Sequence, residues 1–229
     1  KAEIVYENGL KNGLTKYYWN KQLSAEGNFK NNREIGLIKK YHLISKKDDN
    51  LILVVEVIAD LKKGMLEEFS LNGKLLERAK IDGVKFTEGS SSTNEGYRGG
   101  IYPSRNGLTE KWYENGNLKE KGNWKKNNTD SIYNLCSRVG EHIQFHENGN
   151  EFKKGEWIDK CPDGVHKFYY ISGSVEFEVE YSNPKKNNLD YFGNERITMF
   201  PEDENIFRER WYNEDGSLMN SNEIIKKGG

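Results

Sequence analysis

The side chains that could bind a metal ion gather between positions 142 and 166. His142 and His146 lie four residues apart on an expected strand, so they share a face because strand side chains alternate. Cys161 and His166 follow near the next expected connection. Imidazole and thiolate are ligands that zinc prefers, but the spacing matches no established zinc motif. We therefore expect structural roles and no bound metal, with a metal-dependent enzyme at His142, His146 and His166 as an alternative.

The two cysteines could form a disulfide. Cys136 and Cys161 precede Gly140 and Gly164 by four and three residues, at nearly equivalent points of two sequence repeats. Equivalent positions two strands apart would be about 10 Å apart, whereas a disulfide needs Cα atoms within about 7 Å. Both cysteines lie at connections, where this spacing can relax, so the pairing stays open. A disulfide here would favour an oxidising compartment.

Motifs of common enzymes and polyanion-binding proteins are missing from the sequence. No Gly-rich phosphate loop opens a helix and no Gly-x-Ser-x-Gly elbow occurs, so we expect no enzyme and no cofactor. With 35 basic and 36 acidic residues the net charge is −1, which argues against binding of nucleic acid and against a polybasic membrane tether. No apolar run reaches the roughly 20 residues of a membrane span, so membrane contact would be peripheral at most.

The composition favours strands and turns over helices. The 229 residues include four Ala, the best helix former, and 26 Asn, which supports turns. Hydrophobic residues make up 34% and the mean hydropathy is −0.92, which disfavours one large compact core. We therefore expect an all-β chain whose apolar residues are spread along an extended sheet.

A repeat of about 25 residues organises most of the sequence. The copies that open at Gly64, Gly107, Gly140 and Gly164 carry an aromatic five residues later and Asn-Gly or a similar pair at plus eight and plus nine. The copy from Gly13 is one residue shorter before its turn, the copy from Gly36 has a longer connection, and the last copy is partial. A second aromatic closes three copies, at Trp124, Trp157 and Tyr181. Within a single domain of residues 1–229, the copies lie near 13–36, 36–64, 64–89, 107–134, 140–164, 164–190 and 208–228, with insertions at 89–107 and 183–205.

Each copy has the pattern of a β-hairpin. The plus-five aromatic lies on one expected strand, and alternating residues such as Leu118 and Trp124 lie on the next. Asn-Gly supplies the positive φ angles of a two-residue type I′ turn between them. One hairpin cannot bury its own apolar face. We therefore expect six to eight antiparallel hairpins stacked in an elongated array, with residues 219–227 as a short helix or as a cap on the open edge.

This order of residues resembles the bacterial variant of the MORN repeat, MORN_2, found in the YwqK-type antitoxin family. The resemblance, with weaker copies, covers roughly three quarters of the chain. It implies a hairpin array that serves as an interaction scaffold. The residues that carry it are Gly107, Trp112, Tyr113, Glu114, Asn115, Gly116, Leu118, Gly122, Trp124, Lys125 and Asn127.

Aromatic and basic residues provide the candidate contacts with a partner. The plus-five aromatics are expected to form buried core rows: Tyr18, Tyr41, Phe69, Trp112, Phe145, Tyr169 and Trp211. The next residue along the strand alternates to the opposite face, so Tyr113, Tyr170 and Tyr212 would form an exposed binding stripe. Loops often carry binding residues, so the insertion 89–107 would add contacts unless it is only a tolerated surface loop. Its candidates are Tyr97, Arg98, Tyr102 and Arg105.

Together these patterns predict a non-enzymatic scaffold that binds an unidentified protein partner through an extended hairpin surface, such as an antitoxin or immunity protein. The alternative is an envelope-associated protein that binds lipid or glycan. Because the sequence begins at Lys1 rather than Met, we expect an exported or cell-surface bacterial protein with a removed N-terminal signal. A cytoplasmic location stays open.

Overall fold

The computed structural model describes residues 2–19, 21–45, 51–86, 101–127, 136–158, 161–181 and 206–225, and no helix forms among them. The chain divides into two compact units, Lys1–Gly107 and Leu108–Gly229. Strand β10 (Ile101–Trp112) contains the dividing point. The prediction of an all-β fold of stacked antiparallel hairpins is confirmed, whereas a single repeat domain over residues 1–229 stays a prediction.

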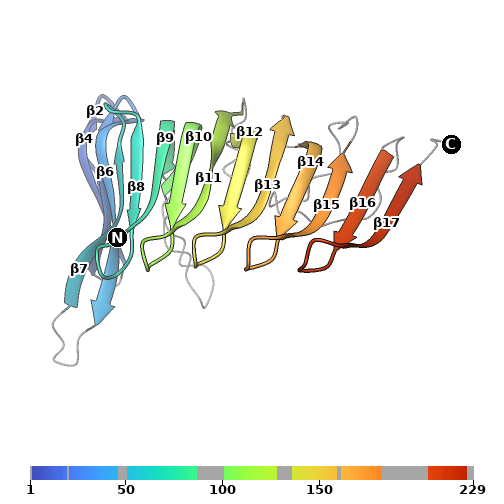
Figure 1. Ribbon diagram of the computed structural model, residues 1–229. Helices are drawn as coiled ribbons and strands as arrows, with labels where there is room; N and C mark the ends of the chain where they lie inside the picture. The colour runs from blue at the N-terminus through green and yellow to red at the C-terminus, as the bar shows by residue number, and fades with distance from the viewer. Residues whose placement is uncertain are drawn as a thin grey trace, which may run out of the picture. The chain divides into compact units, whose positions relative to one another are not determined.

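The first unit is an antiparallel sheet whose strands are hydrogen-bonded in chain order (Figure 1). β2 (Tyr6–Glu7) and β3 (Leu10–Lys11) form a separate two-stranded ribbon. The strands of the sheet are β1 (Ala2–Glu3), β4 (Gly13–Trp19), β5 (Gln22–Lys30), β6 (Arg33–Ser45), β7 (Leu51–Asp60), β8 (Met65–Phe69) and β9 (Leu75–Phe86), followed by the start of β10.

The second unit continues the same hairpin pattern up to β17 (Leu218–Ile225) (Figure 1). The short helix expected over 219–227 is wrong as far as Ile225, because β17 pairs along its length with β16 (Ile206–Tyr212). Asn and Ser are weak helix formers, so the backbone of β17 gains more by joining the sheet. Between β10 and β16 lie β11 (Leu118–Lys126), β12 (Cys136–Phe145), β13 (Glu151–Ile158), β14 (Cys161–Tyr169) and β15 (Val175–Tyr181).

The repeat turns differ from the type I′ turns that the sequence predicts. In these turns the Gly has a left-handed backbone conformation, with φ of 92° at Gly116, whereas the residue before it does not. The amide of Gly116 donates to the carbonyl of Tyr113 and the amide of Tyr113 donates to the carbonyl of Asn117, both at 2.9 Å. This is a three-residue loop, a type I turn closed by a left-handed Gly. Type I′ angles occur instead at Asn8-Gly9, with φ of 51° and 76°.

The Gly that opens a copy lies at a bulge with left-handed backbone. At Gly140 the pairing of β11 with β12 skips two residues, from Val139 to His142. A residue with a Cβ is strained at such φ angles, which explains why copies open on Gly. The six opening glycines have φ between 64° and 118°: Gly13, Gly36, Gly64, Gly107, Gly140 and Gly164.

The side chain two residues after each opening Gly, called the plus-two position, lies at the centre of the buried side of each unit. Three of these side chains lie directly over a glycine of the preceding strand, Ile38 over Gly27 and the two histidines with closer contacts. A Cβ on Gly155 would lie 2.3 Å from Cγ of His166, and a Cβ on Gly122 would lie 2.1 Å from Nδ1 of His142. The plus-two side chains, each at most 5% exposed, are Thr15, Ile38, Leu66, Thr109, His142 and His166.

The first unit fills this buried side with aliphatic side chains. β6 and β9, which are not neighbours in the strand order, also approach each other, so the sheet curls around its core. The core cluster consists of Ile38, Val57, Ala59, Leu66, Ala79, Ile81 and Val84, with Leu61 and Ile101 packed against it. The corresponding side of the second unit carries rings and charges instead.

Candidate binding face of the second unit

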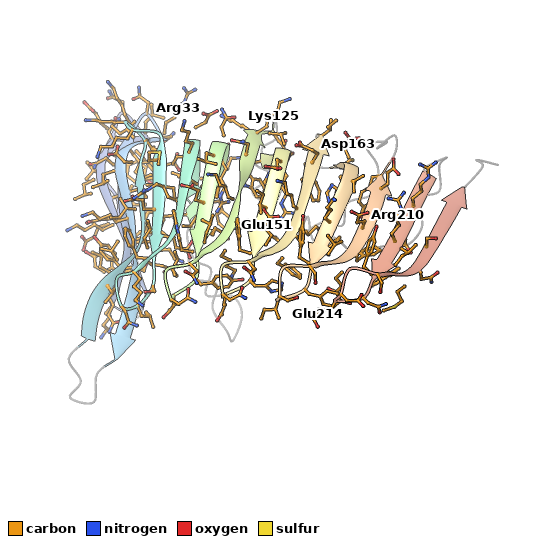
Figure 2. The ribbon with its side chains drawn as sticks, in the orientation of Figure 1. Arg33, Lys125, Glu151, Asp163, Arg210 and Glu214 are labelled. Atoms are coloured by element: carbon orange, nitrogen blue, oxygen red, sulfur yellow. The ribbon has the colours of Figure 1, made fainter. Side chains whose placement is uncertain are left out.

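Strand alternation gives the second unit two chemically different faces. Lys153 lies across from Phe168. Its chain neighbour Lys154 points to the other side and lies across from Lys167. The aromatic face comprises Lys111, Glu120, Trp124, Arg138, His142, Lys153, Trp157, His166, Phe168, Phe177, Tyr181 and Trp211. The polar face comprises Lys121, Glu141, Lys154, Lys167, Glu178, Glu180, Arg208 and Arg210, of which Figure 2 labels Arg210.

The polar face neutralises many of its own charges. Ion pairs cross between neighbouring strands, from Lys154 to Glu141 at 2.7 Å and from Lys167 to Glu178 at 2.9 Å. Arg210 also approaches Glu178, at 3.5 Å. Exposed pairs of this kind add little stability, about 0–1 kcal/mol each. They do make this face a poor candidate for a partner, which would have to displace them.

One row of rings crosses the aromatic face edge to face. It runs from β11 to β15 through Trp124, His142, Trp157, His166 and Tyr181. Successive ring centroids are 5.7, 6.4, 5.7 and 5.0 Å apart, with interplanar angles of 68° to 82°. Edge-to-face contacts are the favourable geometry for aromatic rings. The row therefore acts as a rigid, partly apolar spine across five strands.

The two buried histidines of this row are neutral structural groups. Nε2 of His142 lies 2.7 Å from the carbonyl of Asn123, and Nε2 of His166 lies 2.8 Å from the carbonyl of Glu156. A carbonyl only accepts, so Nε2 carries the hydrogen. Burial lowers the pKa of His142, and it lowers the pKa of His166 to about 4.

The histidines and cysteine of the metal hypothesis do not converge on one point. His142 and His166 are separated by the ring of Trp157, and His146 uses Nε2 to bind the carbonyl of Tyr169 at 3.0 Å. Across the described ranges, no three His, Cys, Asp or Glu side chains are grouped as a metal-ligand set. The geometry thus assigns these imidazoles to packing and backbone hydrogen bonds.

A second row of rings extends to β16, the strand before the last one of the sheet. It links His146, Phe152, Phe168, Phe177 and Trp211, with centroid distances of 5.0, 6.5, 5.4 and 4.2 Å. The last pair is stacked, at an interplanar angle of 27°. Phe152 and Trp211 are each 39% exposed. Large rings at this exposure offer apolar surface to a partner.

Two cations lie against the rings of the aromatic face. Cζ of Arg138 is 5.5 Å from the ring centroid of Trp124 and 5.0 Å from that of Trp157. Nζ of Lys153 is 5.9 Å from the centroid of Trp157 and 4.8 Å from that of Phe168. These are cation–π distances. Burial, reinforced by the charge of Arg138, lowers the pKa of Lys153 to about 7.

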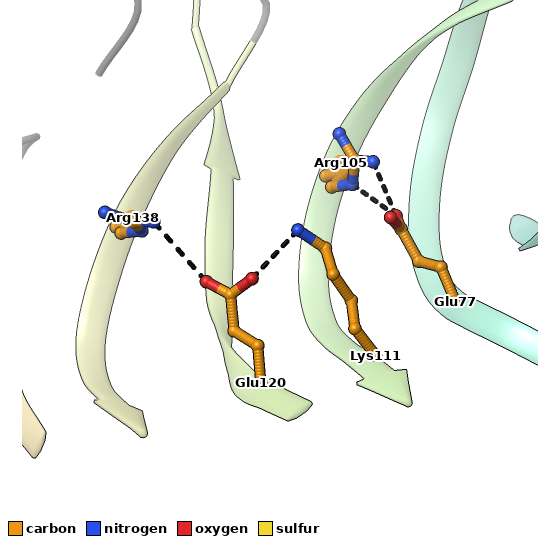
Figure 3. Close-up of polar contacts among 5 residues, drawn as sticks. All are labelled: Glu77, Arg105, Lys111, Glu120 and Arg138. Carbon is orange, nitrogen blue, oxygen red and sulfur yellow. Dashed lines mark hydrogen bonds and ion pairs between the residues drawn. The ribbon is translucent and has the colours of Figure 1, made fainter. Parts of the chain in front are cut away.

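Glu120 links two cations on the same face (Figure 3). Its carboxylate accepts from Nζ of Lys111 at 2.8 Å and lies 3.4 Å from Nη2 of Arg138. Burial opposes the charge of Glu120, but Lys111 and Arg138 outweigh it and hold the pKa of the carboxyl below its usual value. The carboxylate is therefore already used within the chain.

Arg105, a predicted contact residue, is bound inside the first unit (Figure 3). Its Nε donates to Oε1 of Glu77 at 2.7 Å, and Glu77 is 5% exposed. Tyr102 lies half-buried on β10. Tyr97 and Arg98 lie outside the described residues. Partner binding by these four residues stays a prediction.

The position six residues after an opening Gly ties hairpins of the second unit together. Tyr113 and Tyr170, predicted for the exposed stripe, occupy this position, with His146 between them in the chain. Each side chain hydrogen-bonds a backbone carbonyl of the next hairpin. The bonds are Tyr113 Oη to Phe145 O at 2.7 Å, His146 Nε2 to Tyr169 O at 3.0 Å, and Tyr170 Oη to Tyr212 O at 3.0 Å.

The final copy is shifted by one residue relative to the sequence alignment. The amide of Asn213 donates to the carbonyl of Ser217 at 2.8 Å, so Tyr212 takes the position of the plus-five aromatic. Its hydroxyl donates to Glu178 at 3.0 Å. Trp211 consequently lies on the aromatic face. A role of Tyr212 in binding a partner stays a prediction.

The expected core rows of plus-five aromatics are wrong. Alternation from the buried plus-two position places plus four on the same side and plus five on the other. Tyr18 and Tyr41 accordingly donate their hydroxyls to Glu3 at 2.9 Å and Glu26 at 2.7 Å. None of the predicted core aromatics is buried: Tyr18, Tyr41, Phe69, Trp112, Phe145 and Tyr169 are half-buried, and Trp211 is exposed.

The disulfide that the sequence left open is not formed in this structure. Cys136 on β12 is half-buried, Cys161 on β14 is buried, and neither forms a disulfide. β13 lies between their strands. Two strand spacings amount to about 10 Å, which is beyond the reach of a disulfide.

Two segments of the chain match a known family, described as a MORN repeat variant. The matches cover residues 105–126 and 162–183, which include the hairpins of β10 with β11 and of β14 with β15. No curated protein matches the chain. Within the described ranges, no helix has the length and hydrophobicity needed to cross a membrane. These hairpins are therefore similar to MORN repeats, and the stacked hairpins form a repeat scaffold.

Proposed function

We propose that the protein is a non-enzymatic scaffold that binds a protein partner across the aromatic face of its second unit. The observation that carries this proposal is the two rows of rings that cross the strands of this unit, with Phe152 and Trp211 each 39% exposed. Arg138 and Lys153 lie among the rings. Aromatic residues and Arg are the types enriched at protein interfaces and their energetic centres.

Rigidity supports binding through this face. Each hairpin is held to its neighbours by strand pairing and by side-chain bonds such as Tyr113 to the carbonyl of Phe145. A preformed surface loses little conformational entropy on binding. Modest contacts on several strands can therefore add up to a stable complex.

The finer reading is an antitoxin or immunity protein that is exported or displayed on the cell surface. The resemblance to MORN_2 proteins of the YwqK type supports it, together with two matched hairpins. The partner would then be a toxin or a surface component. An envelope protein that binds lipid or glycan is the competing outcome.

Matched variants on adjacent residues test the proposal. Trp211→Ala removes an exposed ring from the aromatic face, whereas Arg210→Ala removes a side chain of the polar face from the next position of β16. Both variants and the wild type would serve as bait for cross-linking and mass spectrometry in extracts of the source organism. Circular dichroism would check that each is folded.

The proposal predicts one dominant protein, cross-linked to the aromatic face, whose capture falls at least about fivefold with Trp211→Ala and stays unchanged with Arg210→Ala. Equal capture by both variants would refute binding at this face. Binding of liposomes or glycans without a captured protein would favour the competing outcome.

A further inference from the structure

We propose that the partner segment that docks on the aromatic face is acidic, with carboxylates at Arg138 and Lys153 and apolar side chains on the neighbouring rings. This inference rests on the proposed scaffold function and names the chemistry of the partner. Its basis is charge complementarity on a half-buried surface.

Two basic side chains lie at the centre of the aromatic face. Arg138 and Lys153 flank the same ring, that of Trp157, at 5.0 and 5.9 Å from its centroid. Their charges act on their surroundings, because both lower the pKa of His166 further than burial alone does. Arg138 also adds to burial in lowering the pKa of Lys153, so the two basic groups repel one another, and an incoming anion relieves that repulsion.

Among the residues that the structure describes, Glu120 and Glu209 are carboxylates that bear on this face. Glu120 is shared between Lys111 and Arg138, and it lies 3.4 Å from the Arg138 nitrogen. Glu209 lies further along, where its charge adds to burial in raising the pKa of Tyr181. Nε of Arg138 is buried and bonds to no residue that the structure describes. The Arg138 side chain is 22% exposed, so part of its guanidinium is accessible to a ligand.

The surroundings of the two cations favour a polypeptide over a polyanion. A nucleic acid or an anionic lipid surface is best met by many exposed cations on one face. Here two cations are set between rings, with Phe168 4.8 Å from Lys153. This arrangement suits a segment that alternates carboxylates with apolar or aromatic side chains, since the rings take the apolar groups.

A labelled peptide pair tests the inference directly. The probe is a nine-residue fluorescein-labelled peptide in which Glu alternates with Phe or Ser, and its control carries Gln in place of every Glu. Fluorescence anisotropy would measure binding to the full chain. Lys153→Met removes one cation, and Lys154→Met is the matched control, because Lys154 is its chain neighbour on the polar face and pairs with Glu141.

We expect the Glu peptide to bind at least about tenfold more tightly than the Gln peptide, and to lose about five- to tenfold with Lys153→Met. Lys153→Arg should restore binding, and Lys154→Met should leave it unchanged. High salt should weaken the Glu peptide selectively. Arg138→Gln is a second variant, used only if circular dichroism shows native structure.

Other outcomes overturn the inference. Equal binding of the two peptides, or equal losses with Lys153→Met and Lys154→Met, would exclude an acidic segment at this site. Vesicles of phosphatidylcholine and phosphatidylserine that bind through Lys153 while the Glu peptide does not would replace it with a lipid surface. A cross-linked partner that reaches the aromatic face through a non-acidic segment would refute the inference and leave the scaffold proposal standing.

Discussion

Replacing Gly155 with Ala should show how tightly the hairpins are fitted to one another. A Cβ at this position would lie 2.3 Å from Cγ, 2.4 Å from Nδ1 and 2.5 Å from Cδ2 of His166. The imidazole cannot move aside easily, because Nε2 bonds the carbonyl of Glu156 at 2.8 Å and the rings of Trp157 and Tyr181 contact it on both sides. The clash must therefore be relieved by shifting strands.

Forced overpacking of a core typically lowers the free energy of unfolding by 1–3 kcal/mol. Since all three contacts are shorter than 3 Å, we expect Gly155→Ala to lie at the upper end, about 3 kcal/mol, and to lower the melting temperature by about 10 °C. Gly83→Ala is the control, because no atom lies within 4 Å of its Cβ and its φ is not left-handed. It should change stability by less than about 1 kcal/mol.

A second substitution distinguishes this clash from a general effect of Ala. Thr fills the plus-two position at Thr15 and Thr109, so His166→Thr in the Gly155→Ala background should recover about 1–2 kcal/mol. Thermal and urea unfolding followed by circular dichroism would measure the four members of the cycle. A Gly155→Ala protein as stable as the wild type, or strictly additive effects, would refute the reasoning.

Three further predictions, tested with four substitutions, concern other contacts. The pKa of His166, near 4, lies below its unfolded value of about 6.5, so between these pH values only the unfolded state gains a proton. The free energy of unfolding should therefore fall by up to about 1.4 kcal/mol per pH unit as the pH drops through this range. Urea titrations at pH 7, 6 and 5 should show a flatter pH dependence for His166→Gln. Tyr113→Phe should cost about 1 kcal/mol in urea unfolding, since it removes the donor to the next hairpin, and no loss would contradict a structural role for the hydroxyl. Glu77→Ala should lower the free energy of unfolding by about 3 kcal/mol, because it leaves the charge of Arg105 half-buried without this carboxylate. Glu67→Ala breaks a more exposed pair and should lower it by less than about 1 kcal/mol in the same assay. Equal losses would show that burial does not matter here.

The hairpin fold could be predicted from the sequence because its signals are local. Opening and turn glycines mark backbone positions that only Gly adopts easily, as the φ values of Gly116 and Gly140 show. The turn type was misjudged because Asn-Gly fits both a type I′ turn and a type I turn closed by Gly. The spacing of the loop, closed by Tyr113 and Asn117, decides between them.

The buried plus-two side chains could not be predicted from the sequence, because they share a position in the repeat but no residue type. The plus-two residues are Thr, Ile, Leu or His, and their common feature is their spacing from the opening Gly. The glycines beneath them carried a signal, since Gly122 and Gly155 recur before an aromatic without lying at a turn. The cations of the aromatic face, Arg138 and Lys153, resemble any surface charge in the sequence until strand register places them around Trp157.

The bonds made by Tyr113, His146 and Tyr170 have a consequence for how such a chain can grow. Their acceptors are backbone carbonyls, which every residue supplies, so this contact does not read the side chains of the following copy. The contact between Gly155 and His166 does depend on the side chains of the neighbouring copy, because an imidazole at that position requires a residue without a Cβ on the adjacent strand. A duplicated or exchanged hairpin would therefore be accepted at its turn end by any neighbour, but at its core only by one with a matching small residue. Gene duplication can thus lengthen the array only where the new neighbours bring matching residue pairs, such as an imidazole and a glycine on adjacent strands.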